Sequence, residues 1–286
     1  MKNLISVDLE DWYTTAYLKD HVSKGSCSPR IIEATEPILE LFAKRKVRAT
    51  FFILGSIAEH NAGLIRRIAG SGHEIASHGY SHTPLWRLSP ASFKEEIVRT
   101  SDILEGISGT RPVGFRAPCA SIDQSTSWAI DILEEEGFHY DSSIFPMRTP
   151  LYGVNKAPVI PYTVASGNIL KKDAKAKIIE IPFSIVKLGL FSIPCTGGFY
   201  GRVIPYPALH YLIGLVNKSR PVNFYFHPWE TYPDIPRIRA PLFNRFVSYF
   251  NTKQYLSKID KLLGSFDFIT FEEFIKTEYG KTPEYT

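Results

Sequence analysis

The sequence lacks several features that would assign it to a special class of protein. Its three cysteines, Cys27, Cys119 and Cys195, show no CxxC spacing, so they predict neither a disulfide framework nor a zinc ribbon. No apolar run reaches the ~18 residues that a membrane-spanning helix needs. The N-terminal apolar stretch is too short for the core of a signal peptide. We therefore expect no transmembrane segment and a cytoplasmic protein.

A strong charge imbalance is also missing. The chain has 33 basic and 29 acidic residues, a net charge of +4, and no basic block interleaved with aromatic residues. Such a balance argues against nucleic acid as a partner. The 286 residues are 44% hydrophobic and 22% charged, which fits one globular domain over residues 1–286. The oligomeric state stays open.

Short apolar segments alternate with amphipathic ones along the chain. We expect strands at 4–8, 47–54, 73–78, 112–118, 138–143, 177–186, 222–228 and just after 266. We expect helices at 31–45, 63–72, 89–109, 121–137, 205–219 and 245–264, with a last one ending near 280. Residues 146–177 are rich in Pro, Gly and Lys and predict an inserted loop region, and residues 240–286 a C-terminal helical segment. Seven or eight βα units predict an α/β barrel with its chemistry at the carboxyl ends of the strands.

Polar residues stand at or near the ends of five expected strands. They are Asp8, His78, Arg116, Asp141 and His227. Packing alone does not explain polar side chains at so many strand ends, so these positions are candidates for a site.

Two histidines and a group of carboxylates are candidates for metal binding. His78 and His82 lie four residues apart, so on a helical turn both imidazoles would face one ion. An isolated pair of this kind is more often two ordinary histidines. The three carboxylates of "SVDLEDWY" make a metal site the better interpretation. One of Asp8, Glu10 and Asp11 would complete a metal site that leaves positions open for water.

The other polar strand ends allow a structural and a catalytic interpretation. Arg116 either forms a structural ion pair or orients a catalytic carboxylate and keeps its pKa low. Asp141 either caps a strand end or pairs with Arg116 or a histidine. His227 either packs after its apolar strand or, opposite a metal site, acts as a general acid.

Five segments in this order resemble the five motifs of the polysaccharide deacetylase family, the NodB-homology domain of carbohydrate esterase family 4. They are "SVDLEDW", "GHEIASHGYSH", "GFRAP", "YDSS" and "FHPWE", and the resemblance spans residues 4–230. Within the family the chain is most similar to deacetylases associated with bacterial exopolysaccharide and O-antigen assembly. "GGFYGRVIPY" at 197–206 also resembles that subgroup.

The resemblance implies a deformed (β/α) barrel of the NodB type and removal of N-acetyl groups from a carbohydrate. It implies a divalent metal, most often zinc, with Co²⁺, Mn²⁺ or Ni²⁺ as alternatives. The resemblance implies Asp8 as the catalytic base, Arg116 as the residue that positions this base, and His227 as the catalytic acid. It implies His78 and His82 as metal ligands and matches Asp141 to the acidic residue of the fourth motif.

The first motif departs from the commonest family pattern of two adjacent aspartates, because Leu9 follows Asp8. Strand alternation puts residues 8 and 10 on one face, which favours Glu10 as the carboxylate ligand. If the chain turns after Asp8, Asp11 reaches the metal instead. Both alternatives stay open.

Aromatic residues near the motifs are expected to line a sugar-binding groove, namely Trp12, Tyr200 and Trp229, although barrel packing would also explain them. The backbone N–H of Cys119 is expected to stabilise the oxyanion of a hydrolytic reaction. The alternative function is an amide or formyl hydrolase acting on a small molecule with the same scaffold. A non-catalytic carbohydrate-binding protein is disfavoured, because the sequence keeps a candidate for every role.

Overall fold

The computed structural model describes residues 1–22, 27–149, 151–188 and 191–280. Residues 281–286 of the expected C-terminal segment and residue 150 of the expected insertion therefore lie outside the described residues. Within the described chain, no helix is both long enough and apolar enough to cross a membrane.

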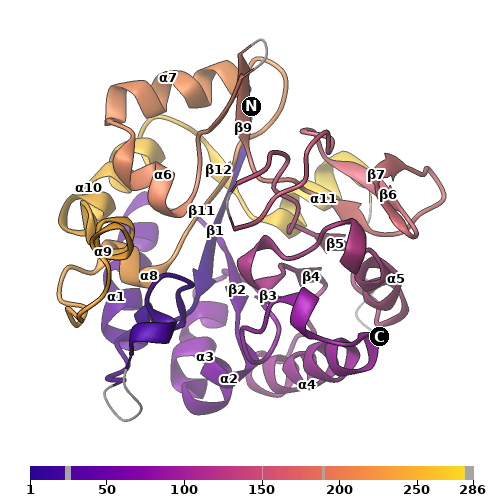
Figure 1. Cartoon of the computed structure of the whole chain (residues 1–286), viewed down its shortest axis with the longest axis horizontal. Helices are drawn as coiled ribbons and strands as arrows, with labels where there is room; N and C mark the ends of the chain where they lie inside the picture. Colours follow the sequence, from indigo (N-terminus) through magenta and orange to yellow (C-terminus); the bar gives the residue numbers. More distant parts are fainter. Residues whose placement is uncertain (23–26, 150, 189–190, 281–286) are drawn as a thin grey trace.

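A mostly parallel sheet runs through the centre of the molecule (Figure 1). Its strand order is β11-β1-β2-β3-β4-β5-β8-β6-β7, and β12 pairs with β1. The strands in parallel pairing are β1 (Asn3–Leu9), β2 (Thr50–Ile53), β3 (Glu74–Ser77), β4 (Gly114–Phe115), β5 (Tyr140–Asp141), β8 (Ile179–Glu180), β11 (Asn223–Phe226) and β12 (Phe268–Ile269). The α/β architecture predicted from the sequence is confirmed.

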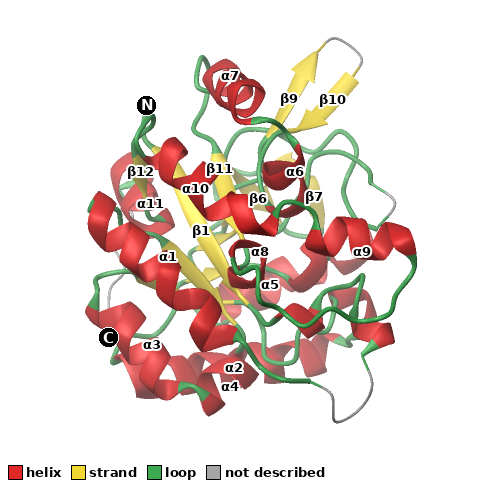
Figure 2. Cartoon of the chain, turned by 90° about the vertical axis from the view of Figure 1, so that its left-hand side faces the viewer, coloured by secondary structure: helices red, strands yellow, loops and turns green. Residues whose placement is uncertain are grey.

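Helices surround this sheet (Figure 2). They are α1 (Ile31–Arg45), α2 (Gly55–His60), α3 (Ala62–Gly70), α4 (Pro90–Ser108), α5 (Trp128–Glu135), α6 (Gly198–Val203), α7 (Tyr206–Val216), α8 (Pro228–Thr231), α9 (Leu242–Tyr249), α10 (Thr252–Leu263) and α11 (Phe271–Tyr279). The ends of α4 follow from the sequence. The Ser89 hydroxyl accepts a hydrogen bond from the Ser92 N–H, and Gly109 takes a left-handed φ of 78°.

Hydrogen bonds of one residue, Asn223, connect β11 to the segment after β8, at the two edges of the parallel strands. Asn223 at the start of β11 donates from Nδ2 to the carbonyls of Ile181 and Pro182, both at 3.2 Å, and its backbone N–H donates to Ser184 Oγ at 2.8 Å. In the described part of the chain, β8 and β11 form no ladder of backbone bonds. Side-chain hydrogen bonds thus bring together the edges that a regular barrel would join as strands.

The expected loop region at 146–177 contains a hairpin, which corrects the prediction. β6 (Tyr162–Ala165) and β7 (Asn168–Lys172) pair antiparallel, and β6 adds to the edge of β8. The turn passes through Gly167, whose φ of 66° suits glycine. The richness of the region in Pro, Gly and Lys hid this short strand pattern.

Two other expected elements are divided in the structure. The helix expected at 245–264 is α9 followed by α10, and the break falls at Asn251 with a left-handed φ of 56°. The strand expected at 177–186 becomes β8 and then β9 (Ile185–Leu188), which pairs with β10 (Phe191–Pro194).

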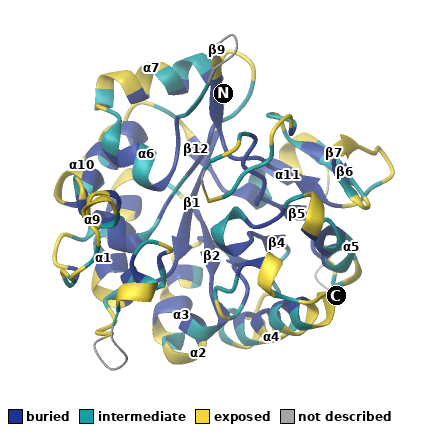
Figure 3. Ribbon diagram, viewed as in Figure 1, coloured by how far each residue is buried: buried dark blue, intermediate teal, exposed yellow. Residues whose placement is uncertain are grey.

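The central parallel strands are the most buried part of the molecule, and exposed residues collect on the surrounding helices, the loops and the β6–β7 hairpin (Figure 3). Every residue of β1 is buried. The parallel register brings the carboxyl ends of β1, β3, β4 and β11 to the same side of the sheet. The segments that follow these strands carry the candidate residues.

Candidate active site

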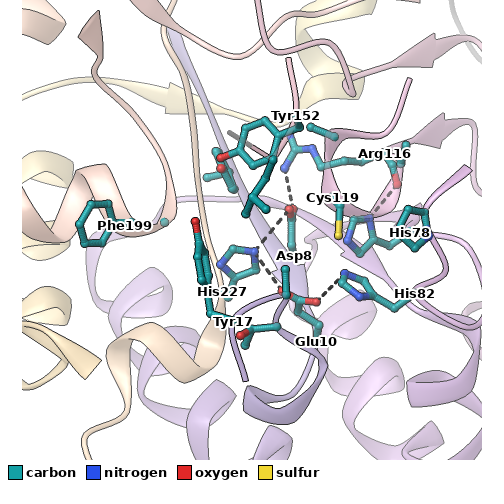
Figure 4. A pocket seen from close by; sticks show the side chains of 18 of the residues that line it. Asp8, Glu10, Tyr17, His78, His82, Arg116, Cys119, Tyr152, Phe199 and His227 are labelled. Atoms are coloured by element: carbon teal, nitrogen blue, oxygen red, sulfur yellow. Dashed lines mark hydrogen bonds and ion pairs between the residues drawn. The ribbon is translucent and has the colours of Figure 1, made fainter. Parts of the chain in front are cut away.

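A cavity of about 360 Å³ opens at the carboxyl ends of the strands (Figure 4). Its volume is in the range of small-molecule sites. The polar side chains that line it include Asp8, Glu10, His78, His82, Arg116, His227 and Glu230. The structure thus brings together most of the residues that the sequence predicted for a site.

Asp8 is held by a fully buried arginine. Arg116 donates from one terminal nitrogen to Asp8 Oδ1 at 2.6 Å and to Ser6 Oγ at 2.8 Å. Its Nε donates to the carbonyl of Ser142 at 3.0 Å, and the other terminal nitrogen donates to Ser142 Oγ at 2.9 Å. Because these bonds fix the guanidinium, one oxygen of Asp8 is fixed too, and Oδ2 faces the side of His227.

The two histidines and Glu10 form a set of donors suited to a metal ion. Nitrogen atoms of His78 and His82 and an oxygen of Glu10 all lie within 4.8 Å of one another, and Glu10 Oε2 lies 2.7 Å from His82 Nε2. His78 Nδ1 lies 2.7 Å from the carbonyl of Arg116. This bond assigns the ring proton to Nδ1 and leaves Nε2 free as a ligand, an arrangement typical of metal-binding histidines.

The electrostatics agree with that donor set. Burial lowers the pKa of His78 to about 4, so its imidazole is neutral, as metal ligation requires. Burial opposes ionisation of Glu10, but the charges of His82 and His227 outweigh it and lower its pKa, so it is an anion. Two histidine side chains and a carboxylate are donor types that fit a divalent ion such as zinc.

The turn that carries the two histidines is not helical, which corrects the expectation of a helical turn. Residues 78–84 form a loop after β3, and His82 has a φ of 59°. The carboxylate of Glu96 accepts from the backbone N–H groups of Tyr80 and Ser81 at 3.1 and 3.3 Å and holds this loop. A non-glycine residue in the left-handed region costs free energy, and here it accompanies a side chain aimed into the cavity.

Asp11 lies outside the donor set. Its Oδ1 accepts from the Trp12 N–H and its Oδ2 from the Arg30 N–H, both at 2.8 Å. Burial raises the pKa of this carboxyl to about 6 despite those bonds. Of the two carboxylates left open by the sequence, the structure brings Glu10 to the histidines and keeps Asp11 at the start of a short helix.

His227 completes the polar wall of the cavity. Its Nε2 lies 3.1 Å from Glu10 Oε1 and 4.0 Å from Asp8 Oδ2, while Nδ1 lies 2.8 Å from Glu230 Oε2. Burial lowers its pKa, but the negative charges of Glu10 and Glu230 outweigh burial and raise the pKa to about 9. In this set of side chains the imidazole is therefore protonated at neutral pH.

Glu230 and Arg202 are residues that the sequence reasoning missed. Glu230 Oε1 accepts from Arg202 Nε at 2.8 Å, and both side chains are buried. The signal for Glu230 was its position three residues after His227, where its carboxylate also accepts from the backbone N–H of His227 at 3.1 Å. No local pattern in residues 197–206 indicated that Arg202 would pair with Glu230.

Asp141 does not line the cavity and lies at the end of β5, which fits the structural alternative and not a pairing with Arg116 or a histidine. It is fully buried, accepts from the hydroxyl of Ser143 and is hydrogen-bonded to Glu180 on the neighbouring strand. Burial raises the pKa of both carboxyls, so this pair shares a proton. Ser142, the next residue along the chain, contacts Arg116 instead.

The expected substrate-binding residues divide into two groups. Trp12 is corrected: it is fully buried, donates from Nε1 to the carbonyl of Ser28 at 3.0 Å and does not line the cavity. Cys119, Tyr200 and Trp229 do line it. The indole of Trp229 stacks on the His227 ring with centroids 5.4 Å apart, so it supports that ring. Cys119 has a φ of 57° at the cavity edge.

Two family models match the chain, one in each half. Residues 28–140 match the model described as polysaccharide deacetylase, and residues 142–276 match a domain of unknown function, DUF3473. The first model includes His78, His82 and Arg116. The second includes His227 and Glu230, while Asp8 and Glu10 precede both.

Curated relatives agree with the first model. A peptidoglycan-N-acetylglucosamine deacetylase of Bacillus cereus is 30% identical over 123 residues, 39% of this chain and 45% of the relative. A peptidoglycan deacetylase-like protein of Gibberella zeae is 33% identical over 141 residues, 47% of this chain and 41% of the relative. The chain thus spans less than half the length of these two relatives. Over the segments that match, the chain is thus similar to polysaccharide deacetylases.

Solved structures share the fold over nearly the whole chain. The PuuE allantoinase aligns with a TM-score of 0.64 at 14% identity, covering 98% of this chain and 91% of that one. The Bc1960 peptidoglycan N-acetylglucosamine deacetylase aligns with a TM-score of 0.52 at 17% identity, covering 95% and 86%. At these identities the likeness shows the fold alone.

Proposed function

We propose that this chain, a relative of the polysaccharide deacetylases, is a metal-dependent hydrolase that removes N-acetyl groups from a sugar. One observation carries the proposal. A carboxylate fixed by Arg116, a protonated imidazole fixed by Glu230, and two histidines with Glu10 face one another across a single cavity. Hydrolysis of an amide needs a base, an acid and a centre that stabilises negative charge, and each has a candidate here.

His78, His82 and Glu10 would hold the metal in this proposal. A divalent ion, zinc by the nature of the ligands, supplies polarisation of the amide carbonyl and lowers the pKa of water. The carbonyl of Arg116 orients His78, and the hydroxyl of Thr14 donates to Glu10 Oε2 at 2.9 Å. These contacts orient the ligands before an ion arrives.

Asp8 is the proposed base. Arg116 occupies Oδ1, so Oδ2 is the oxygen that takes the proton from the attacking water. His227 is the proposed acid, since its Nε2 faces the same space and carries a proton that the leaving nitrogen needs. The water oxygen bonds to the acetyl carbon, the amide C–N bond breaks, the acetyl group leaves as acetate, and the amine leaves with the proton from His227. The backbone N–H of Cys119 is proposed to stabilise the oxyanion.

The proposed substrate is an N-acetylated sugar of a bacterial surface polysaccharide or its precursor. Half-exposed rings of Trp86, Tyr17 and Tyr200 line the cavity, and such rings can stack on pyranose faces. The sequence of 197–206 further supports a substrate from exopolysaccharide or O-antigen assembly, because this segment resembles that subgroup and carries Tyr200.

Acetate release tests the proposal. The metal-loaded wild type should release acetate from N-acetylhexosamine oligomers and leave small cyclic amides and formamides unchanged. His78→Ala should lose both bound metal and activity, whereas Asp8→Asn should lose activity and keep the metal. Preference for the small amides would support the alternative function, and activity that survives in His78→Ala would contradict the proposed site.

A further inference from the structure

An exposed apolar strip lies on α9 and the residue that follows it. Leu242 is 82% exposed, Phe243 64%, Phe246 46% and Phe250 41%, and the rings of Phe246 and Phe250 lie 4.9 Å apart. Figure 3 shows α9 as one of the most exposed elements of the molecule. Single exposed apolar residues are common, but four on one short segment indicate a surface that binds something.

Exposed cations flank this apolar strip in the sequence. Arg237, Arg239, Arg245 and Lys253 are all exposed, and residues 235–259 contain no Asp or Glu. Large apolar side chains on one side of a helix, with Arg and Lys beside them, are typical of helices that lie in the headgroup region of a bilayer. The positive charge of this segment complements anionic lipids.

The residues of α9 next to the apolar strip contact the proposed site. Val247 lines the cavity, and the ring of Phe246 lies 5.8 Å from that of Phe199, which also lines it. Arg202, the partner of Glu230, donates to the carbonyls of Val247 at 2.6 Å and Phe250 at 2.7 Å. A surface that contacts the apolar strip therefore lies next to the opening of the cavity.

We propose that the apolar strip and its four cations bind an anionic bilayer, with α9 lying in the headgroup region. The bound orientation would place the cavity beside glycans carried on that membrane. Membrane binding itself stands on the surface of α9 and the residues that flank it. The substrate class that it indicates, a membrane-associated glycan, rests on the proposed deacetylase function.

Co-sedimentation with lipid vesicles tests the proposal without any need for activity. The wild type should bind vesicles of phosphatidylcholine and phosphatidylglycerol, bind pure phosphatidylcholine much more weakly, and dissociate as salt is raised. Arg237→Gln/Arg239→Gln should weaken binding by about 25-fold, since each cation near such a surface contributes about fivefold. Leu242→Ser/Phe243→Ser should weaken it by about tenfold or more.

Matched controls carry the same changes elsewhere. Ile32→Ser/Tyr211→Ser removes residues that are 47% and 65% exposed on other helices, and Lys171→Gln/Lys172→Gln removes two exposed cations. Both should bind vesicles as the wild type does. All variants should keep wild-type hydrolysis of a soluble oligosaccharide, so failure of the deacetylase proposal would be seen separately.

Three results of the vesicle experiment would overturn the proposal. They are no binding to anionic vesicles, equal loss in the control variants, and equal binding to neutral vesicles. A dimer that forms without lipid and disappears in Leu242→Ser/Phe243→Ser would also overturn it, because the apolar strip would then be a contact between two copies of this chain.

Discussion

Replacing Glu230 with glutamine would test the hydrogen-bonded chain behind His227. The change keeps the size of the side chain and removes its charge. Glu230 Oε1 accepts from Arg202, while Oε2 accepts from the backbone N–H of His227 and faces His227 Nδ1. Glutamine has one oxygen where glutamate has two, so it cannot accept on both sides.

The structure gives the expected size of the effect. The bond between Glu230 and His227 involves charged groups and is buried, and such bonds contribute about 1.5–3 kcal/mol. If this contribution acts through the orientation and proton of the acid, kcat should fall by about 10-fold to 150-fold. KM and metal content should stay unchanged, because Glu230 contacts neither His78 nor His82 in the structure.

Steady-state acetate release, metal analysis and thermal unfolding together make the assay. Unfolding must be followed because the variant also disturbs Arg202, and breaking a buried ion pair destabilises proteins by about 3–5 kcal/mol. Glu180→Gln is the matched control, since it makes the same change in another fully buried carboxyl that has no contact with His227. It should keep the wild-type kcat.

The reasoning has a clear point of failure. A folded Glu230→Gln variant with the kcat of the wild type would show that Glu230 does not act on the acid. A raised KM with unchanged kcat would instead indicate that Glu230 contributes to substrate binding, and the proposed role would be wrong.

Three further predictions follow from single contacts. Glu10→Gln should abolish tight metal binding, while Asp11→Asn should keep the metal and lower the free energy of unfolding by about 1 kcal/mol, both measured by metal analysis and urea unfolding. Burial and the neighbouring Asp141 raise the pKa of Glu180, so the folded protein keeps a proton that the unfolded chain releases. Its stability should then fall as pH rises above 4.5, by up to about 1.4 kcal/mol per pH unit, and Glu180→Gln should flatten that slope in urea unfolding from pH 5 to 8. Lys46 ends α1 with a φ of 56°, so Lys46→Gly should raise the free energy of unfolding by about 0.5–1 kcal/mol, and a decrease would contradict this account.

Elements with local signals could be predicted from the sequence. The helix expected at 31–45 is α1 (Ile31–Arg45) with the same bounds, and α4 begins and ends where Ser89 and Gly109 predicted. In both helices the apolar spacing is local, and in α4 both ends are also encoded within a few residues, by Ser89 and Gly109. The division of 245–264 was missed because its cause, the left-handed backbone at Asn251, leaves the apolar pattern on both sides intact.

Contacts between distant segments could not be predicted in the same way. Asn223 joins the edges of the sheet through carbonyls about forty residues away, and Arg202 reaches Glu230 across 28 residues. No periodicity encodes either bond. The sequence "YDSS" offered three adjacent polar residues, and only the direction of β5 decides that Ser142 faces Arg116 while Asp141 faces Glu180.

The choice between Glu10 and Asp11 shows why a correct pattern still left two answers. Alternation after Asp8 places Leu9 in the core and Glu10 in the cavity, yet a turn in the chain would have reversed the order. The start of α1 decides which of the two carboxylates meets the histidines. The backbone N–H of Arg30, at the beginning of α1, needs an acceptor, and Asp11 Oδ2 provides it. Because that carboxylate is held at the helix, Glu10 is the acid left to meet the two histidines.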